Sequence, residues 1–401
     1  MVASHSTTTA LVTQGQASPA QALNIAPPSG PLSVTNLDVS SWQPRYPTIG
    51  QFAMTESQDV IAAGPDGLFS FKRVHDHGSK PWSQPRPFPP TRLDSSCISG
   101  IALYEANERL TVFCVANGAI HSFSRSSTNK DGKGSPEFVA DSSPPLPTYR
   151  VSGTPCITAI CRGSGYSKAQ RWSLVVPSKS GGLLHTSTTG PTSPSGWSRE
   201  TKTDWEPVDH VAANLGIISA VCITAFYTGT NYDYSSSDRT DIVAVCIVKG
   251  RLHSVEGPFS WPHSIYSSPH WKGEITARIH HPGEVTGNPA LLNVRKGNTR
   301  QDQLDLLVPS AEGGIFHFVR TPSTPDEWHM IGRIGFPSGL PAAGSLAFFR
   351  YEKRYDGGDK IRAALQIGGK LYIIQTKDGS NPWARCLLNP VTGPGPAYGY
   401  D

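Results

Sequence analysis

Six segments of the chain repeat one pattern: an apolar strand, a tight turn that contains glycine, and a second strand that often carries histidine. The turn glycines are Gly67, Gly118, Gly182, Gly250, Gly314 and Gly369. Successive turns are separated by 51, 64, 68, 64 and 55 residues, which is longer than most solenoid repeats and suits a blade of four antiparallel strands. The repeat therefore predicts an all-β fold, a six-bladed β-propeller with four antiparallel strands per blade.

Each blade is expected to begin with an innermost strand just upstream of the repeated hairpin. These strands are predicted at 48–54, 97–105, 155–162, 218–227, 288–294 and 344–351. A fourth, outer strand often carries tryptophan, at Trp82, Trp197, Trp328 and Trp383. Residues 32–42 form a further strand that is expected to close the ring beside the last blade, because closure removes exposed sheet edges. Seven blades are the alternative, with the extra blade in 190–217 or 255–287, but neither interval contains a full strand set.

The composition divides the chain into three parts. Residues 1–31 are rich in Ser, Thr, Ala, Gln and Pro, which is typical of a disordered segment. Residues 32–391 are predicted to form a single propeller domain, and 392–401 a loose C-terminal tail. All-β repeat folds commonly reach this length as one unit.

Charge and motif content exclude several classes of partner. The net charge of +4 is spread over 35 basic and 31 acidic residues without a basic run, so no nucleic acid is expected as a partner. No apolar stretch is long enough for a membrane span or a signal peptide, and no Asn-x-Ser/Thr sequon occurs. Seven cysteines, mostly in apolar strands, form no CxxC pair. These features favour a cytoplasmic protein with neither a metal nor a cofactor.

The repeated side chains are interpreted as structural. His121, His185, His253 and His317 occupy the same place on the third strand of four blades. Imidazole binds metals and titrates near neutrality, but these positions lie away from the axis and far from one another. Recurrence of tryptophan at one point of the blade likewise favours packing between blades over stacking on sugars.

Residues suited to chemistry cluster in the connections between blades. The candidates are Tyr149 and Arg150 in one connection, Asp209 and His210 in a second, and His280, His281 and Glu284 in a third. If these loops lean over the axial opening, they bring together groups that can transfer a proton to or from a bound substrate. No GxSxG, HExxH, Walker or dinucleotide motif is present, which argues against nucleotide- or NAD-dependent chemistry.

The sequence of apolar strand, Gly-Gly turn, Leu-His-Phe-like strand and tryptophan resembles fungal six-bladed propellers of the fucose-lectin type. That resemblance implies sugar sites at blade boundaries, built from Arg, Glu and aromatic residues, but the same set is not repeated in this sequence. The chain is also similar in length and lack of motifs to cofactor-free fungal natural-product cyclases of the hetero-Diels–Alderase type.

Loops that differ from blade to blade on a regular scaffold are typical of one composite pocket. The sequence therefore predicts a cofactor-free enzyme of secondary metabolism that cyclises, dehydrates or isomerises a small, largely apolar substrate in the axial pocket. Orientation of the reacting groups supplies roughly 7–11 kcal/mol in such reactions. The alternatives are a carbohydrate-binding lectin, with glycans as partners, and a protein-interaction scaffold.

Overall fold

The computed structural model describes part of the chain in detail. The described residues are 47–391 without 56–57, 74–81, 88–97, 107–108, 127–136, 142–144, 147–148, 163–168, 189–204, 228–239, 261–269, 272, 296–301, 322, 325, 337–339, 354–358 and 376–386. The expected disordered segment 1–31, the closing strand 32–42, Trp197, Trp383 and the tail 392–401 lie outside them. Within the described part, no helix is long and apolar enough to cross a membrane.

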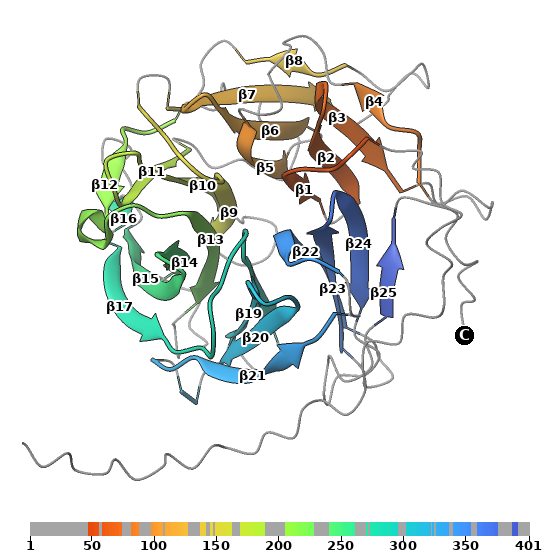
Figure 1. Cartoon of the computed structure of the whole chain (residues 1–401). Helices are drawn as coiled ribbons and strands as arrows, with labels where there is room; N and C mark the ends of the chain where they lie inside the picture. The colour runs from red at the N-terminus through yellow and green to blue at the C-terminus, as the bar shows by residue number, and fades with distance from the viewer. Residues whose placement is uncertain are drawn as a thin grey trace, which may run out of the picture.

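The strands form six antiparallel sheets in a ring, as Figure 1 shows. Blade 1 contains β1 (Phe52–Met54), β2 (Asp59–Gly64), β3 (Gly67–Lys72) and β4 (Arg86–Pro87). Blade 2 contains β5 (Ile98–Ala106), β6 (Arg109–Ala116), β7 (Ala119–Ser126) and β8 (Val139–Ala140). Blade 3 contains β9 (Cys156–Arg162), β10 (Ala169–Pro177), β11 (Leu183–Ser187) and β12 (Asp209–Val211).

The remaining blades follow the same order. Blade 4 contains β13 (Ala220–Tyr227), β14 (Thr240–Val248), β15 (Arg251–Ser260), β16 (His270–Trp271) and β17 (Glu274–Ile279). Blade 5 contains β18 (Ala290–Arg295), β19 (Asp302–Pro309), β20 (Ile315–Arg320) and β21 (His329–Ile334). Blade 6 contains β22 (Ala343–Lys353), β23 (Asp359–Ile367), β24 (Lys370–Gln375) and β25 (Leu387–Pro390). The prediction of six blades is confirmed, because β16 and β17 both pair with β15 and form no blade of their own.

The innermost strands make a closed inner ring. Each of β1, β5, β9, β13, β18 and β22 contacts the innermost strands of both neighbouring blades. The strands approach closely where residues are small: a Cβ added at Gly100 would lie 2.2 Å from the Cα atom of Thr154 in the next blade. The side-chain amide of Asn288 in blade 5 donates to the amide oxygen of Gln51 in blade 1. This bond joins blades that are not neighbours and therefore spans part of the axial opening.

The hydrophobic core is divided among the blade boundaries. Six clusters of buried apolar side chains are present, one between each pair of adjacent blades. The alternation of side chains along each strand explains the division. On β19, Leu307 packs against blade 6, whereas Leu306 and Val308 pack against blade 4. A strand that is apolar on both faces thus belongs to two cores.

The first and last blades close the ring by direct contact. The Ile49 amide donates to the Gly369 carbonyl at 2.8 Å, and the Gln366 side chain donates to the Ile49 carbonyl at 2.9 Å. One of the six apolar clusters also joins these blades, through residues such as Phe52 and Leu371. Residues 47–54 therefore fasten blade 1 to blade 6.

Candidate functional site

The hairpin turns and the connections between blades lie on the same rim of the ring. Strands alternate in direction, so the turn between the second and third strands faces the same side as the segment that leads to the next blade. We call this side the connection rim. The Val151 amide donates to the Gly118 carbonyl at 3.1 Å, and the Val285 amide donates to the Gly250 carbonyl at 3.5 Å. The connections that leave blades 2 and 4 are thereby held against the turn glycines of those blades.

The turn glycines are required by their backbone geometry. All six have positive φ, a region that L-residues with a side chain rarely adopt. At Gly314, where φ is +82°, an added Cβ would lie 2.4 Å from the Ile334 carbonyl oxygen. The turns are confirmed where the sequence predicts them, and they fix the position of every connection on this rim.

The repeated histidines lie on the third strands, as predicted, and two of them are buried with polar partners. The His185 ring contacts the Ser173 hydroxyl at 2.6 Å, and the His317 ring lies 2.7 Å from an Asp305 carboxylate oxygen. In both blades the polar partner lies on the second strand. It precedes by two positions the residue that is opposite the histidine in the sheet. His185 also meets Trp271 of the next blade edge to face. These contacts explain the two side chains as interior polar groups.

The other two histidines are less buried because their blades lack that polar partner. The corresponding second-strand residues are Val112 in blade 2 and Ala244 in blade 4. His253 is half-buried, and burial together with the charge of Arg251 lowers its pKa from the ordinary value. His253 therefore belongs to an outward-facing region of blade 4.

Four of the predicted site residues flank the turn of blade 3, residues 178–182. The Arg150 carbonyl accepts from the Lys179 amide at 3.3 Å, which places the exposed Tyr149 and Arg150 on one side of this turn. On the other side, the His210 ring is 2.7 Å from the Gly181 carbonyl oxygen, and Asp209 stands opposite His185 in the sheet.

Asp209 and His210 are on β12, the outermost strand of their blade. They lie toward the perimeter of the ring.

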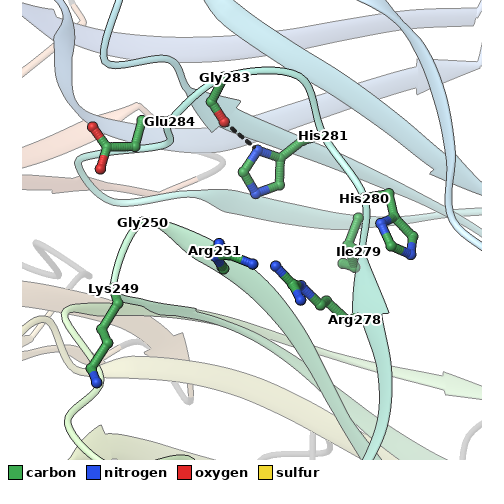
Figure 2. A pocket seen from close by; sticks show the side chains of 9 residues that line it. All are labelled: Lys249, Gly250, Arg251, Arg278, Ile279, His280, His281, Gly283 and Glu284. Atoms are coloured by element: carbon green, nitrogen blue, oxygen red, sulfur yellow. Dashed lines mark hydrogen bonds between the residues drawn. The ribbon is translucent and has the colours of Figure 1, made fainter. Parts of the chain in front are cut away.

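The remaining three candidates share a pocket of about 380 Å³ at the boundary of blades 4 and 5 (Figure 2). We call this the basic pocket; its polar lining consists of Lys249, Arg251, Arg278, His280, His281 and Glu284. The turn of blade 4 supplies the first two residues, and the end of β17 with the following connection supplies the others. The structure thus brings together His280, His281 and Glu284 and leaves Tyr149, Arg150, Asp209 and His210 beside another blade.

His281 is held in a defined orientation within the basic pocket. Its Nδ1 donates to the Gly283 carbonyl at 2.8 Å, and its ring lies 6.3 Å from the ring of Phe316 in blade 5. Burial lowers the pKa of His281, and the charges of Arg251 and His280 act in the same direction. The lowered pKa favours the neutral ring, in which Nδ1 donates to the Gly283 carbonyl and Nε2 is an acceptor.

The three cations of the basic pocket were not predicted from the sequence. Arg251 follows the turn glycine directly, and Arg278 pairs with His253 across the β15–β17 ladder. The basic residues on each side of Gly250 were visible in the sequence. The contribution of Arg278 to the pocket depends on its pairing with His253, which lies 25 positions earlier in the sequence. That pairing could not be identified from the repeat alone.

A second missed feature is an arginine stacked on aromatic rings at two blade boundaries. Arg320 of blade 5 pairs with Glu256 of blade 4 at 2.5 Å and lies over the rings of Phe226 and Trp328. Its side chain is only 5% exposed, so this arginine is an interior cation that holds two blades together.

Arg125 of blade 2 is arranged in the same way. It pairs with Asp59 of blade 1 at 2.6 Å and lies over the Phe138 ring. Both arginines lie in the last two residues of a third strand, and an aromatic residue follows each of them near the fourth strand. This recurrence was visible in the sequence.

Among the described residues, no group of three or more His, Cys, Asp or Glu side chains is placed to hold a metal ion. Cys114, Cys222 and Cys246 are buried and Cys156 is partly buried. Burial raises the pKa of Cys114 and of Cys156 to about 12. The Cys156 thiol donates to the Val221 carbonyl at 2.8 Å.

Comparisons with known proteins support the fold. No protein-family model and no curated protein matches the sequence. The structure is similar to AofleA from Arthrobotrys oligospora, with a TM-score of 0.52 and 10% identity over 86% of this chain and 88% of that one. An arginine-to-alanine triple mutant of AofleA aligns with a TM-score of 0.54 at the same identity and coverage. The predicted resemblance to fungal propellers of the fucose-lectin type is thereby confirmed at the level of the fold.

Proposed function

We propose that this protein is a carbohydrate-binding propeller of the lectin type and that the basic pocket is its ligand site. The observation that carries the proposal is the pocket itself, an open hollow at a blade boundary lined by hydrogen-bonding side chains. Glu284 offers acceptors to sugar hydroxyls, and the neutral His281 ring offers an acceptor at Nε2. The similarity of the fold to AofleA and the resemblance of the sequence to propellers of the fucose-lectin type both support this proposal.

The cofactor-free cyclase predicted from the sequence has less support. A cycloaddition of apolar groups calls for a pocket that is mostly apolar, with a few polar groups to orient the substrate. The basic pocket has the opposite character, because six of its lining residues are charged or imidazole side chains. Two of its lining residues, Arg278 and Ile279, belong to β17, a strand that Figure 1 shows at the perimeter of the ring rather than at the axis.

Glycan-array screening followed by calorimetric titration tests the proposal. We expect saturable binding that depends on the basic pocket. Glu284→Gln should weaken binding about tenfold or more, because a hydrogen bond to a charged group contributes about 1.5–3 kcal/mol. His210→Ala is the matched control, an imidazole removed from the same rim beside blade 3.

Two results would contradict this function or this site. Absence of binding to every glycan class on the array would reject the carbohydrate-binding function. Equal weakening by His210→Ala and Glu284→Gln would move the site away from the basic pocket.

A further inference from the structure

Strand pairing in blade 4 gathers basic side chains on one face of the sheet. Leu252 and Ile279 are opposite each other on β15 and β17, and both are buried in the core between blades 4 and 5. Since side chains alternate along a strand, the flanking residues face the other way. Arg251 and Arg278 are among them, and both are exposed at the basic pocket.

Among the described residues, no ion pair within 4.0 Å joins a carboxylate to Lys249, Arg251 or Arg278 of the basic pocket. Figure 2 shows the guanidinium groups of the two arginines turned toward each other, with Glu284 beside the turn at Gly250. By contrast, Arg333 in blade 5 is paired with a carboxylate at 3.3 Å. Like charges that converge in this way are stabilised by an anion placed between them.

Blade 4 has arginine at two positions where the neighbouring blades 3 and 5 have other residues. The residue opposite the repeated histidine is Asp209 in blade 3 and Gly332 in blade 5, but Arg278 in blade 4. The residue after the turn glycine is apolar in blades 3 and 5 and is Arg251 in blade 4. The propeller architecture does not require basic residues at either position, so their presence in a pocket points to a ligand.

We propose that the basic pocket binds an acidic saccharide, whose carboxylate or sulfate group is held between Arg251 and Arg278. The proposal extends the carbohydrate-binding function given above and rests on it. A guanidinium group binds a carboxylate or sulfate through two parallel N–H donors, which fixes the orientation of the sugar. Lys249 adds a third positive charge at the edge, while Glu284 and His281 remain for the ring hydroxyls. The volume of about 380 Å³ is at the lower end for small-ligand sites and suits one or two sugar rings.

Calorimetric titration of the full chain with three sets of oligosaccharides tests the proposal: uronic-acid oligomers, sulfated oligomers, and neutral oligomers of matched length. Inorganic sulfate serves as a separate probe that carries the charge without the sugar. The variants are Arg251→Gln and Arg278→Gln, which remove a charge from an exposed side chain and leave the core unchanged. Lys179→Ala is the matched control, because Lys179 is a cation on the connection rim outside the pocket.

We expect an acidic oligomer to bind at one site, with binding weakened about tenfold or more in each arginine variant and unchanged in Lys179→Ala. Preference for the acidic oligomer over inorganic sulfate would further support the proposal. If neutral oligomers bind and acidic ones do not, or if Lys179→Ala weakens binding as much as the arginine variants, the acidic-ligand proposal is overturned and the carbohydrate function stands. If no oligosaccharide of any set binds, both proposals are wrong.

Discussion

Replacing Asp305 with alanine removes a buried acceptor that serves two donors. The His317 ring nitrogen lies 2.7 Å from one carboxylate oxygen, and the Gln303 amide donates to the other at 2.8 Å. His317 is 2% exposed, so water cannot replace the lost acceptor there, whereas the half-buried Gln303 can turn toward solvent. Removing the acceptor of a buried donor costs about 1–3 kcal/mol, and more where the lost acceptor is a charged carboxylate. We expect Asp305→Ala to lower the free energy of unfolding by about 2–4 kcal/mol.

Urea denaturation measures this loss better than heating. With an unfolding entropy of about 2.1 cal/mol/K per residue, a chain of this length changes its melting temperature by only roughly 1–1.5 °C per kcal/mol. The urea midpoint should fall while the slope stays unchanged. Ser173→Ala, at the matching position of blade 3, should cost less than Asp305→Ala, because it removes a neutral hydroxyl.

The double variant Asp305→Leu/His317→Leu tests the physical reason. Replacing both polar partners with apolar side chains removes the unpaired group, so most of the loss should be recovered. A wild-type urea midpoint for Asp305→Ala would refute the interpretation of the pair as a buried interaction. The interpretation would also be refuted if the double variant lost as much unfolding free energy as the two single variants together, because partners in contact should be coupled.

Three further predictions concern the turns, the titrating histidines and the thiols. Gly314→Ala should destabilise the chain more than Gly313→Ala in urea denaturation, because an added Cβ meets the Ile334 carbonyl at 2.4 Å in the first case and nothing within 4 Å in the second. The free energy of unfolding should fall as pH drops below about 7, because the pKa values of His253 and His281 in the folded chain lie below the ordinary histidine value and the unfolded chain takes up protons first. The urea midpoint of His253→Gln, measured at pH 7.5 and 5.5, should depend less on pH than that of the wild type. Cys114 should resist alkylation at pH 8 in the folded chain and react after denaturation, as read by peptide mass mapping, because burial raises its pKa to about 12.

The fold was largely predictable because its signals are local. A turn that needs positive φ selects glycine in each repeat, and continuous apolar runs mark strands buried on both faces. The innermost strands were located to within a few residues for the same reason. By contrast, outer strands such as β4 and β8 contain two residues each and have no periodicity to detect.

The site was predictable only in part because it depends on contacts between distant segments. The cluster of His280, His281 and Glu284 was identified since these residues are neighbours in the sequence. The position of this cluster in one pocket with Arg251 depends on the register of β15 and β17. The ion pair of Arg320 with Glu256 joins residues 64 positions apart in different blades. No pattern within one repeat specifies such neighbours.

The division of the interior into six separate clusters has a consequence for how the sequence can diverge. Substitutions that disturb one cluster are coupled to each other, but those in clusters on opposite sides of the ring share no contacts and should act independently. Each blade boundary can thus accumulate changes under its own constraint while the remaining five keep the chain folded. A boundary with an unusual surface, such as that of blades 4 and 5, is therefore compatible with ordinary packing everywhere else.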